Sequence, residues 1–139
     1  MLKLFIGSHG AFASGILSAV EVLLGKQGSI TTYDAFLDDS TVRDAADAFF
    51  SSLTPEDQAI LVSDLYGGSV NTTLCGYLDR PNTTLISGAN LALILALALE
   101  PAPVTADRIR ELVGQARDQL RVVVLEEAAP ATADPDFFD

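Results

Sequence analysis

Short apolar runs alternate with helical patterns along most of this chain, and this alternation restricts its fold more than any other feature. The first run, at 2–6, is followed over 12–24 by apolar residues at helical spacing, with Gly25 where a helix would end. The same order recurs with predicted strands at 29–36, 59–62 and 83–87 and predicted helices at 42–50, 69–78 and 91–99. Strands that alternate with helices pair through right-handed crossovers, so we predict an α/β fold with an open, mostly parallel sheet and helices on both faces.

The end of the chain has a different character. An amphipathic helix is predicted from Thr105 to Leu120, and a last strand is predicted at 121–126. From residue 127 onward the chain is acidic and contains no lysine or arginine, a composition typical of segments without fixed structure. We therefore predict one domain at 1–126, followed by an acidic, flexible tail at 127–139.

Charge and the small number of cysteine and histidine residues exclude several classes of function. The net charge is -11, with 19 acidic against 8 basic residues, so the chain lacks a basic stripe with which to bind nucleic acid. One cysteine, Cys75, and one histidine, His9, are too few for an intrachain disulfide or a zinc site. We therefore expect a cytoplasmic protein that uses no metal or other cofactor.

The run at 91–99 is apolar on all sides. It is shorter than the roughly 20 residues that a helix needs to cross a bilayer, so we predict no direct insertion into a membrane. We expect instead that this helix is covered at a subunit interface, because a small monomer rarely covers a helix on every side.

Two predicted strand ends carry residues that together suit phosphoryl chemistry. His9 ends the first strand, Asp64 follows the third, and a turn of Gly67, Gly68 and Ser69 opens the next helix. Ligands of open α/β sheets bind at the carboxyl ends of the strands, so we expect these residues to meet. A carboxylate on one imidazole nitrogen leaves the other nitrogen as a nucleophile, and backbone N–H groups at a helix start favour an anion. We therefore predict a phosphohistidine site with His9 and Asp64 as catalytic residues and the Gly-Gly-Ser turn as the phosphate-binding element.

Each of these elements also has a plainer interpretation. A single histidine is more often a surface or core residue, Asp64 can cap the next helix, and a Gly-Gly pair can serve a turn. Other catalytic classes lack their characteristic motifs here, since the chain contains no Gly-x-Ser-x-Gly, no Gly-x-Gly-x-x-Gly and no P-loop. The three elements together therefore favour phosphoryl transfer more than any one of them does.

Four sequence motifs resemble those of a known family. They are Ile-Gly-Ser-His-Gly at 6–10, Glu-Val-Leu-Leu-Gly at 21–25, Val-Ser-Asp-Leu-Tyr-Gly-Gly-Ser at 62–69 and Ser-Gly-Ala-Asn-Leu at 87–91. With these motifs in this order, residues 2–126 resemble the enzyme IIA domain of the mannose family of the phosphoenolpyruvate-dependent sugar phosphotransferase system.

The resemblance implies a phosphocarrier. His9 would accept a phosphoryl group from the histidine-containing phosphocarrier protein and pass it to an enzyme IIB partner, for sugar uptake and phosphorylation. Asp64 matches the aspartate that orients the histidine, and Ser69 matches a serine near the phosphoryl group. The family also implies a homodimer, in which the last strand, at 121–126, is exchanged between subunits and pairs antiparallel with the partner's sheet.

Two positions depart from the family's pattern, and several alternatives stay open. Val70, followed directly by Asn71, stands where the family commonly has Pro-x-Asn, and Ala92 replaces a proline. These differences put the identity of the partner in question. One alternative is a regulatory phosphoprotein of an incomplete phosphotransferase system, which would act on a regulatory protein without sugar transport. The others are a dihydroxyacetone kinase subunit, which usually has Ser-His-Ser where this chain has Ser-His-Gly, and a ligand-binding module without a covalent step.

Overall fold

The computed structural model describes residues 1–128 of the chain. Four strands form one sheet in the order β2-β1-β3-β4, and each neighbouring pair is parallel. They are β1 (Leu2–His9), β2 (Ile30–Ala35), β3 (Gln58–Ser63) and β4 (Thr83–Ser87). The predicted α/β fold with a parallel sheet is therefore confirmed, and the four strands predicted before residue 90 are all present.

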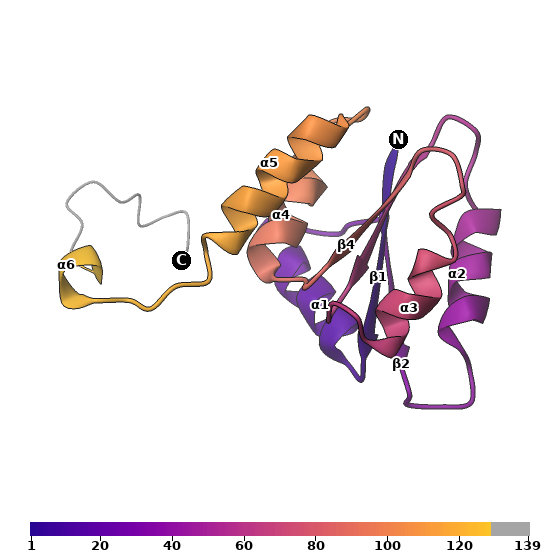
Figure 1. The fold of residues 1–139 in the computed structure, drawn as a ribbon, viewed down its shortest axis with the longest axis horizontal. Coiled ribbons are helices and arrows are strands. Elements are labelled where there is room, and N and C mark those ends of the chain that lie inside the picture. Colours follow the sequence, from indigo (N-terminus) through magenta and orange to yellow (C-terminus); the bar gives the residue numbers. More distant parts are fainter. Residues whose placement is uncertain (129–139) are drawn as a thin grey trace.

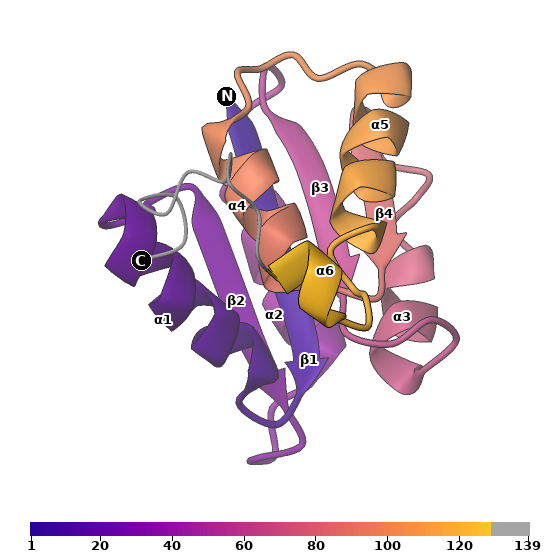
Figure 2. The same cartoon turned by 90° about the vertical axis from the view of Figure 1, so that its left-hand side faces the viewer.

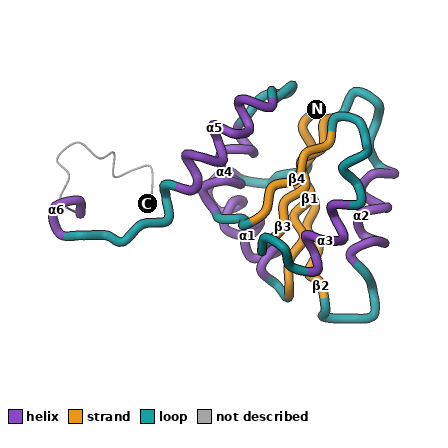
Figure 3. The backbone as a smooth tube through the Cα atoms, in the orientation of Figure 1, coloured by secondary structure: helices purple, strands orange, loops and turns teal. Residues whose placement is uncertain are grey.

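Helices cover both faces of the sheet (Figure 1, Figure 3). One face carries α1 (Phe12–Leu24), α4 (Leu91–Leu99) and α5 (Ala106–Arg117), and the other carries α2 (Val42–Ser51) and α3 (Ser69–Cys75). Each face has an apolar core of its own, as expected for helices packed on both sides of a parallel sheet.

The central strand β1 contributes side chains to both cores. Leu4 and Ile6 pack in the core beneath α1, α4 and α5, whereas Phe5 packs in the core beneath α2 and α3. Successive side chains of a strand point to opposite faces, so a strand buried on both sides must be apolar at consecutive positions. This burial explains the unbroken apolar run that predicts the strand, and it holds the end of β1 rigidly between β2 and β3.

The apolar helix α4 coincides with its predicted range. Its side chains at Leu93, Ile94 and Leu97 are buried against the sheet, while Leu91 and Leu99 are exposed in the single chain. Among residues 1–128, no helix combines the length and the apolar character that crossing a membrane requires.

The predicted strand at 121–126 is absent from the single chain. Residues 121–124 have no regular structure, and the short helix α6 (Leu125–Ala128) follows them. After α5 the chain runs away from the sheet in Figure 1, so that α6 lies nearest the viewer in Figure 2. A strand forms only beside another strand that completes its hydrogen bonds, and this segment borders no strand of its own sheet. Exchange of the segment between subunits stays a prediction, and the predicted tail from residue 129 onward lies outside the described residues.

Candidate functional site

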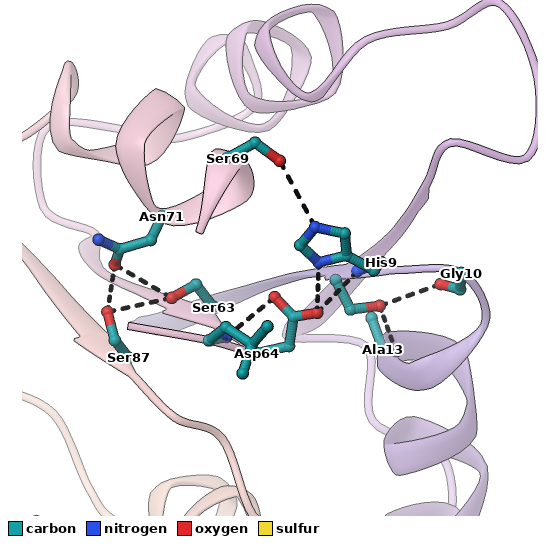
Figure 4. A network of polar contacts seen from close by, with 10 residues as sticks. His9, Gly10, Ala13, Ser63, Asp64, Ser69, Asn71 and Ser87 are labelled. Atoms are coloured by element: carbon teal, nitrogen blue, oxygen red, sulfur yellow. Dashed lines mark hydrogen bonds and ion pairs between the residues drawn. The ribbon is translucent and has the colours of Figure 1, made fainter. Parts of the chain in front are cut away.

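The sheet brings the ends of β1 and β3 side by side. Gly7 of β1 is aligned with Ser63 of β3, so His9 and Asp64 lie at the same edge of the sheet. Figure 4 shows the Asp64 carboxylate on one side of the His9 ring and Ser69, at the start of α3, on the other. The structure thus places together the three side chains for which the sequence predicts a common site.

Asp64 contacts His9 at two points. Its Oδ2 accepts hydrogen bonds from the ring Nδ1 and from the backbone N–H of His9, each at 2.8 Å. A carboxylate has no proton to donate, so in the neutral ring the proton lies on Nδ1 and the lone pair lies on Nε2. The His9 side chain is 43% exposed, which leaves Nε2 accessible to a reacting group.

The Asp64 carboxylate is held in the ionised form. Burial raises the pKa of this group, but hydrogen bonds from the backbone and the ring of His9 outweigh burial and bring the pKa of Asp64 below its ordinary value. The second carboxylate oxygen, Oδ1, accepts the N–H of Leu65 at 3.0 Å. Both oxygens are therefore occupied, and the carboxylate is fixed in charge and in direction.

The turn between β3 and α3 lies beside the free nitrogen of His9. Ser69 Oγ is 3.5 Å from Nε2, at the outer limit of a hydrogen bond. A Cβ at Gly68 would lie 3.6 Å from His9 Cε1, and Gly67 has a φ of 75°, a conformation that favours glycine. Gly67 thus supplies the conformation of the turn, whereas a side chain at Gly68 would touch the His9 ring at an ordinary van der Waals distance. The first N–H groups of a helix have no acceptor within it.

Ser8 fixes the turn on the other side of His9. Its side chain is fully buried, and its Oγ donates to the carbonyl of Gly10 at 3.0 Å and accepts the N–H of Ala13 at 2.7 Å. These bonds stabilise the start of α1, where the N-cap residue Ala11 provides no side-chain hydrogen bond. The sequence features that indicate a site at His9 do not predict that Ser8 supports the turn.

The chain is similar to known proteins over most of its length. Residues 3–116 match the sequence model of the family EIIA-man, the fructose IIA component of the phosphotransferase system. The chain belongs to the EIIA-man family. The resemblance stated from the four motifs is therefore confirmed, and membership makes the protein a IIA component of the phosphotransferase system.

Solved structures agree with this membership. A Klebsiella pneumoniae protein described as a permease of the phosphoenolpyruvate-dependent sugar phosphotransferase system is 33% identical, with a TM-score of 0.77 over 87% of this chain and 90% of that one. A mannose/sorbose-specific IIA subunit from Enterococcus faecalis shares the fold at 20% identity, with a TM-score of 0.72 over 88% of this chain and 95% of that one. A IIA protein associated with the fucose utilization operon of Streptococcus pneumoniae shares the fold at 23% identity, with a TM-score of 0.71 over 87% of this chain and 92% of that one. No curated protein matches the chain.

In this EIIA-man protein, a polar network anchors α3 behind the site (Figure 4). The hydroxyl groups of Ser63 and Ser87 both bind Oδ1 of Asn71, the first at 3.1 Å, and lie 3.1 Å from each other. Ser63 and Asn71 are buried. Because Ser63 directly precedes Asp64 and Asn71 lies in the first turn of α3, the network fixes the distance between the carboxylate and Ser69.

The departures from the family's pattern are accommodated by packing. Val70 is fully buried, and a Cβ at Gly7 would lie 3.0 Å from its Cγ1. The missing side chain of Gly7 therefore lets α3 pack directly on β1 through Val70. Ala92, in the first turn of α4, packs against the core on the opposite face. In this EIIA-man chain the start of α3 is thus held by the packing of Val70 on β1.

Proposed function

We propose that this IIA component is a phosphohistidine carrier. His9 Nε2 accepts a phosphoryl group from the histidine-containing phosphocarrier protein and passes it to a histidine of an enzyme IIB partner, for sugar uptake and phosphorylation. The observation that carries this proposal is the pairing of Nδ1 with Asp64 at 2.8 Å, which in the neutral ring leaves the lone pair on Nε2 of a side chain that is 43% exposed. Family membership supports the same chemistry.

The proposed transfer is an in-line displacement at phosphorus. The lone pair of Nε2 forms the new N–P bond while the N–P bond of the donor phosphohistidine breaks, and the donor ring leaves with that electron pair. The His9 ring keeps its Nδ1 proton and gains positive charge, which the ionised Asp64 stabilises. The transition state of such a transfer is loose, so the protein mainly has to position the reactants.

The turn at the start of α3 is proposed to bind the phosphoryl oxygens. Ser69 Oγ lies 3.5 Å from Nε2, within reach of an oxygen on a phosphoryl group attached to that nitrogen. Gly67 and Gly68 add no side chains that would occupy this space. The N–H groups that begin α3 supply further donors.

The surface around His9 is proposed to dock a protein partner. The loop after β2 exposes Phe36, and the loop after β3 exposes Leu65 and Tyr66, so apolar side chains flank His9 from both neighbouring strands. Exposed apolar groups gathered around a reactive side chain are typical of a protein interface. Because the chain carries a net charge of -11, we propose that the docking face of the partner is positively charged.

A homodimer is proposed from the end of the chain. β4 is an edge strand of the described sheet, and the nearby segment exposes the apolar side chains of Leu120, Val122, Val123, Val124 and Leu125. An apolar, β-branched segment exposed to water is unfavourable and pairs readily with a sheet edge. We propose that 121–126 crosses to a second copy and pairs antiparallel with its sheet. Sedimentation of the native chain as a monomer at micromolar concentration would contradict the dimer.

The proposed reaction uses groups of the chain alone, without a cofactor. Cys75 is a free, exposed thiol in the structure. Free thiols persist in reducing compartments, which supports our proposal that the carrier acts in the cytoplasm.

Intact mass spectrometry tests the carrier function. The native chain is incubated with phosphoenolpyruvate, enzyme I and the phosphocarrier protein, beside a His9→Ala variant. We expect one acid-labile phosphoryl group on the native chain and none on the variant, followed by loss of the label when an enzyme IIB is added. Uptake of phosphate by His9→Ala would show that another residue is the acceptor, and a label that is never passed on would favour the regulatory alternative.

A further inference from the structure

Phe36 covers one face of the His9 ring. The ring centroids are 5.1 Å apart, and the ring planes are tilted by 38°. Phe36 directly follows Ala35, the residue of β2 that is aligned with His9 of β1. The carbonyl of Ala35 accepts the N–H of Gly10 at 2.9 Å. The contact between the two rings is therefore set by the register of two paired strands and by a hydrogen bond that joins their ends.

The backbone of Phe36 is in an unusual conformation for a large residue. Its φ is 68°, in the left-handed region that bulky side chains avoid for steric reasons. The residue is 63% exposed, so it buries little apolar surface to offset this cost. Backbone strain that yields little packing indicates a role in function more than a role in stability.

The loop after Phe36 is held by hydrogen bonds of its own. Asp38 Oδ1 accepts the N–H of Ser40 at 2.9 Å and also the Ser40 hydroxyl, which lies 2.6 Å from the hydroxyl of Tyr33. The next residue, Thr41, caps α2 with its side chain. The loop is thus fixed at both ends, which keeps Phe36 against the His9 ring.

We propose that Phe36 is a positioning residue that fixes the plane of the His9 ring, an inference that rests on the proposed function of His9. Asp64 holds the ring at a single atom, Nδ1, and one hydrogen bond tolerates a swing of the ring plane about the bond to Cβ. The contact with Phe36 limits that swing and keeps Nε2 directed toward Ser69. In-line transfer requires this alignment, because a small misplacement of a nucleophile lowers the rate steeply.

Three variants separate positioning from other roles of Phe36. Phe36→Asn removes the aromatic ring and suits the left-handed φ, whereas Phe36→Tyr keeps the ring. Leu37→Ala is the matched control, because Leu37 lies on the same loop and is 65% exposed, as Phe36 is at 63%. All variants are compared with the native chain by thermal unfolding.

Two measurements avoid any effect on partner docking. The first is the rate of phosphorylation by phosphoramidate, a small phosphoryl donor, followed by intact mass. The second is the order parameter of the His9 ring, from 13C relaxation of the unphosphorylated chain. His9 is the only histidine, so its ring signals are unambiguous.

We expect Phe36→Asn to react about tenfold more slowly and to show a more mobile His9 ring, with an unfolding midpoint no lower than that of the native chain. Phe36→Tyr and Leu37→Ala are expected to retain the native rate and ring order. A Phe36→Asn chain with native rate and ring order would overturn the inference. A parallel loss of rate and unfolding midpoint would also overturn it, because that result indicates a structural role. If the native chain takes phosphate from neither phosphoramidate nor the phosphocarrier protein, the proposed function fails, and the ring order alone then decides whether Phe36 positions His9.

Discussion

Replacement of Asp64 by asparagine is the substitution whose consequences the structure defines most closely. Asp64 accepts three hydrogen bonds, from the backbone N–H and the ring of His9 and from the N–H of Leu65, whereas an asparagine of the same size has one oxygen and an NH₂ group. If the amide oxygen faces His9, it still accepts the two hydrogen bonds from His9 but carries no negative charge. If the NH₂ group faces His9, the ring proton moves to Nε2 and blocks attack on phosphorus.

The expected loss follows from the strength of these bonds. Hydrogen bonds to charged groups contribute about 1.5–3 kcal/mol, and those between neutral groups contribute about 1 kcal/mol. Removal of the charge beside the ring that becomes cationic therefore destabilises the transition state by about 0.5–2 kcal/mol, the difference between these two contributions, which corresponds to a rate about two- to thirtyfold lower. Molecules with the proton on Nε2 react more slowly still.

Rapid-quench mixing with the phosphorylated phosphocarrier protein, followed by intact mass, measures this rate. Calorimetric titration of the unphosphorylated proteins measures binding, which we expect to be unchanged in Asp64→Asn because the side chain is only 12% exposed. Circular dichroism confirms that the variant is folded, and His9→Ala defines the background. Transfer by Asp64→Asn within twofold of the native rate would refute the role assigned to the carboxylate.

Four further predictions rest on the packing of α3, the pKa of Asp64 and the net charge of the chain. Gly7→Ala brings a methyl group to 3.0 Å from a side chain of α3, so we expect an unfolding free energy lower by about 1–3 kcal/mol and slower phosphorylation. The control is Gly15→Ala in α1, where the added methyl group meets nothing within 4 Å and should not be destabilising. Equal effects of the two substitutions would be evidence against the packing argument. Asn71→Ala removes the acceptor shared by the buried hydroxyl of Ser63 and the half-buried hydroxyl of Ser87, so chemical denaturation should show a loss of about 1–3 kcal/mol together with slower transfer. A native rate would count against the anchoring of α3. The pKa of Asp64 is lowered in the folded chain, so the stability that the carboxylate contributes is complete above about pH 5 and is lost as the pH falls through the ordinary aspartate range near 4 and below. Asp64→Asn should therefore flatten the dependence of the unfolding free energy on pH in this range. An unchanged slope would be inconsistent with the lowered pKa. Transfer from the phosphocarrier protein should slow as ionic strength rises, and a rate independent of salt would exclude electrostatic steering by the net charge of -11.

The sheet could be predicted from the sequence because its central strands are buried on both faces. Such strands read as unbroken apolar runs, and their ends are marked by the change to small and polar residues at His9 and after Asp64. The pattern indicates that both residues lie at the carboxyl edge of the sheet. It does not give the strand order, and only the direct pairing of β1 with β3 brings the carboxylate to the imidazole.

The supporting residues could not be predicted, because their contacts depend on tertiary structure. Phe36 carries none of the glycine or asparagine signals by which positive φ angles are usually anticipated, and its partner is a ring on another strand. In the sequence, Asn71 is notable only because it lies one position earlier than the asparagine of the motif Pro-x-Asn. Its role as an acceptor that anchors α3 depends on the hydroxyl groups of Ser63 and Ser87, which only the fold brings to it. The segment at 121–126 has a strand-like composition, but its pairing depends on a second chain.

The nitrogen that carries the phosphoryl group provides the most direct test of the proposed carrier. The chain is prepared with 15N in its single histidine, phosphorylated through enzyme I and the phosphocarrier protein, and examined for coupling between 31P and 15N. We predict coupling of phosphorus to Nε2 of His9, with the proton retained on Nδ1 beside Asp64. Phosphorus on Nδ1, on another residue, or on no residue of the native chain would contradict this function.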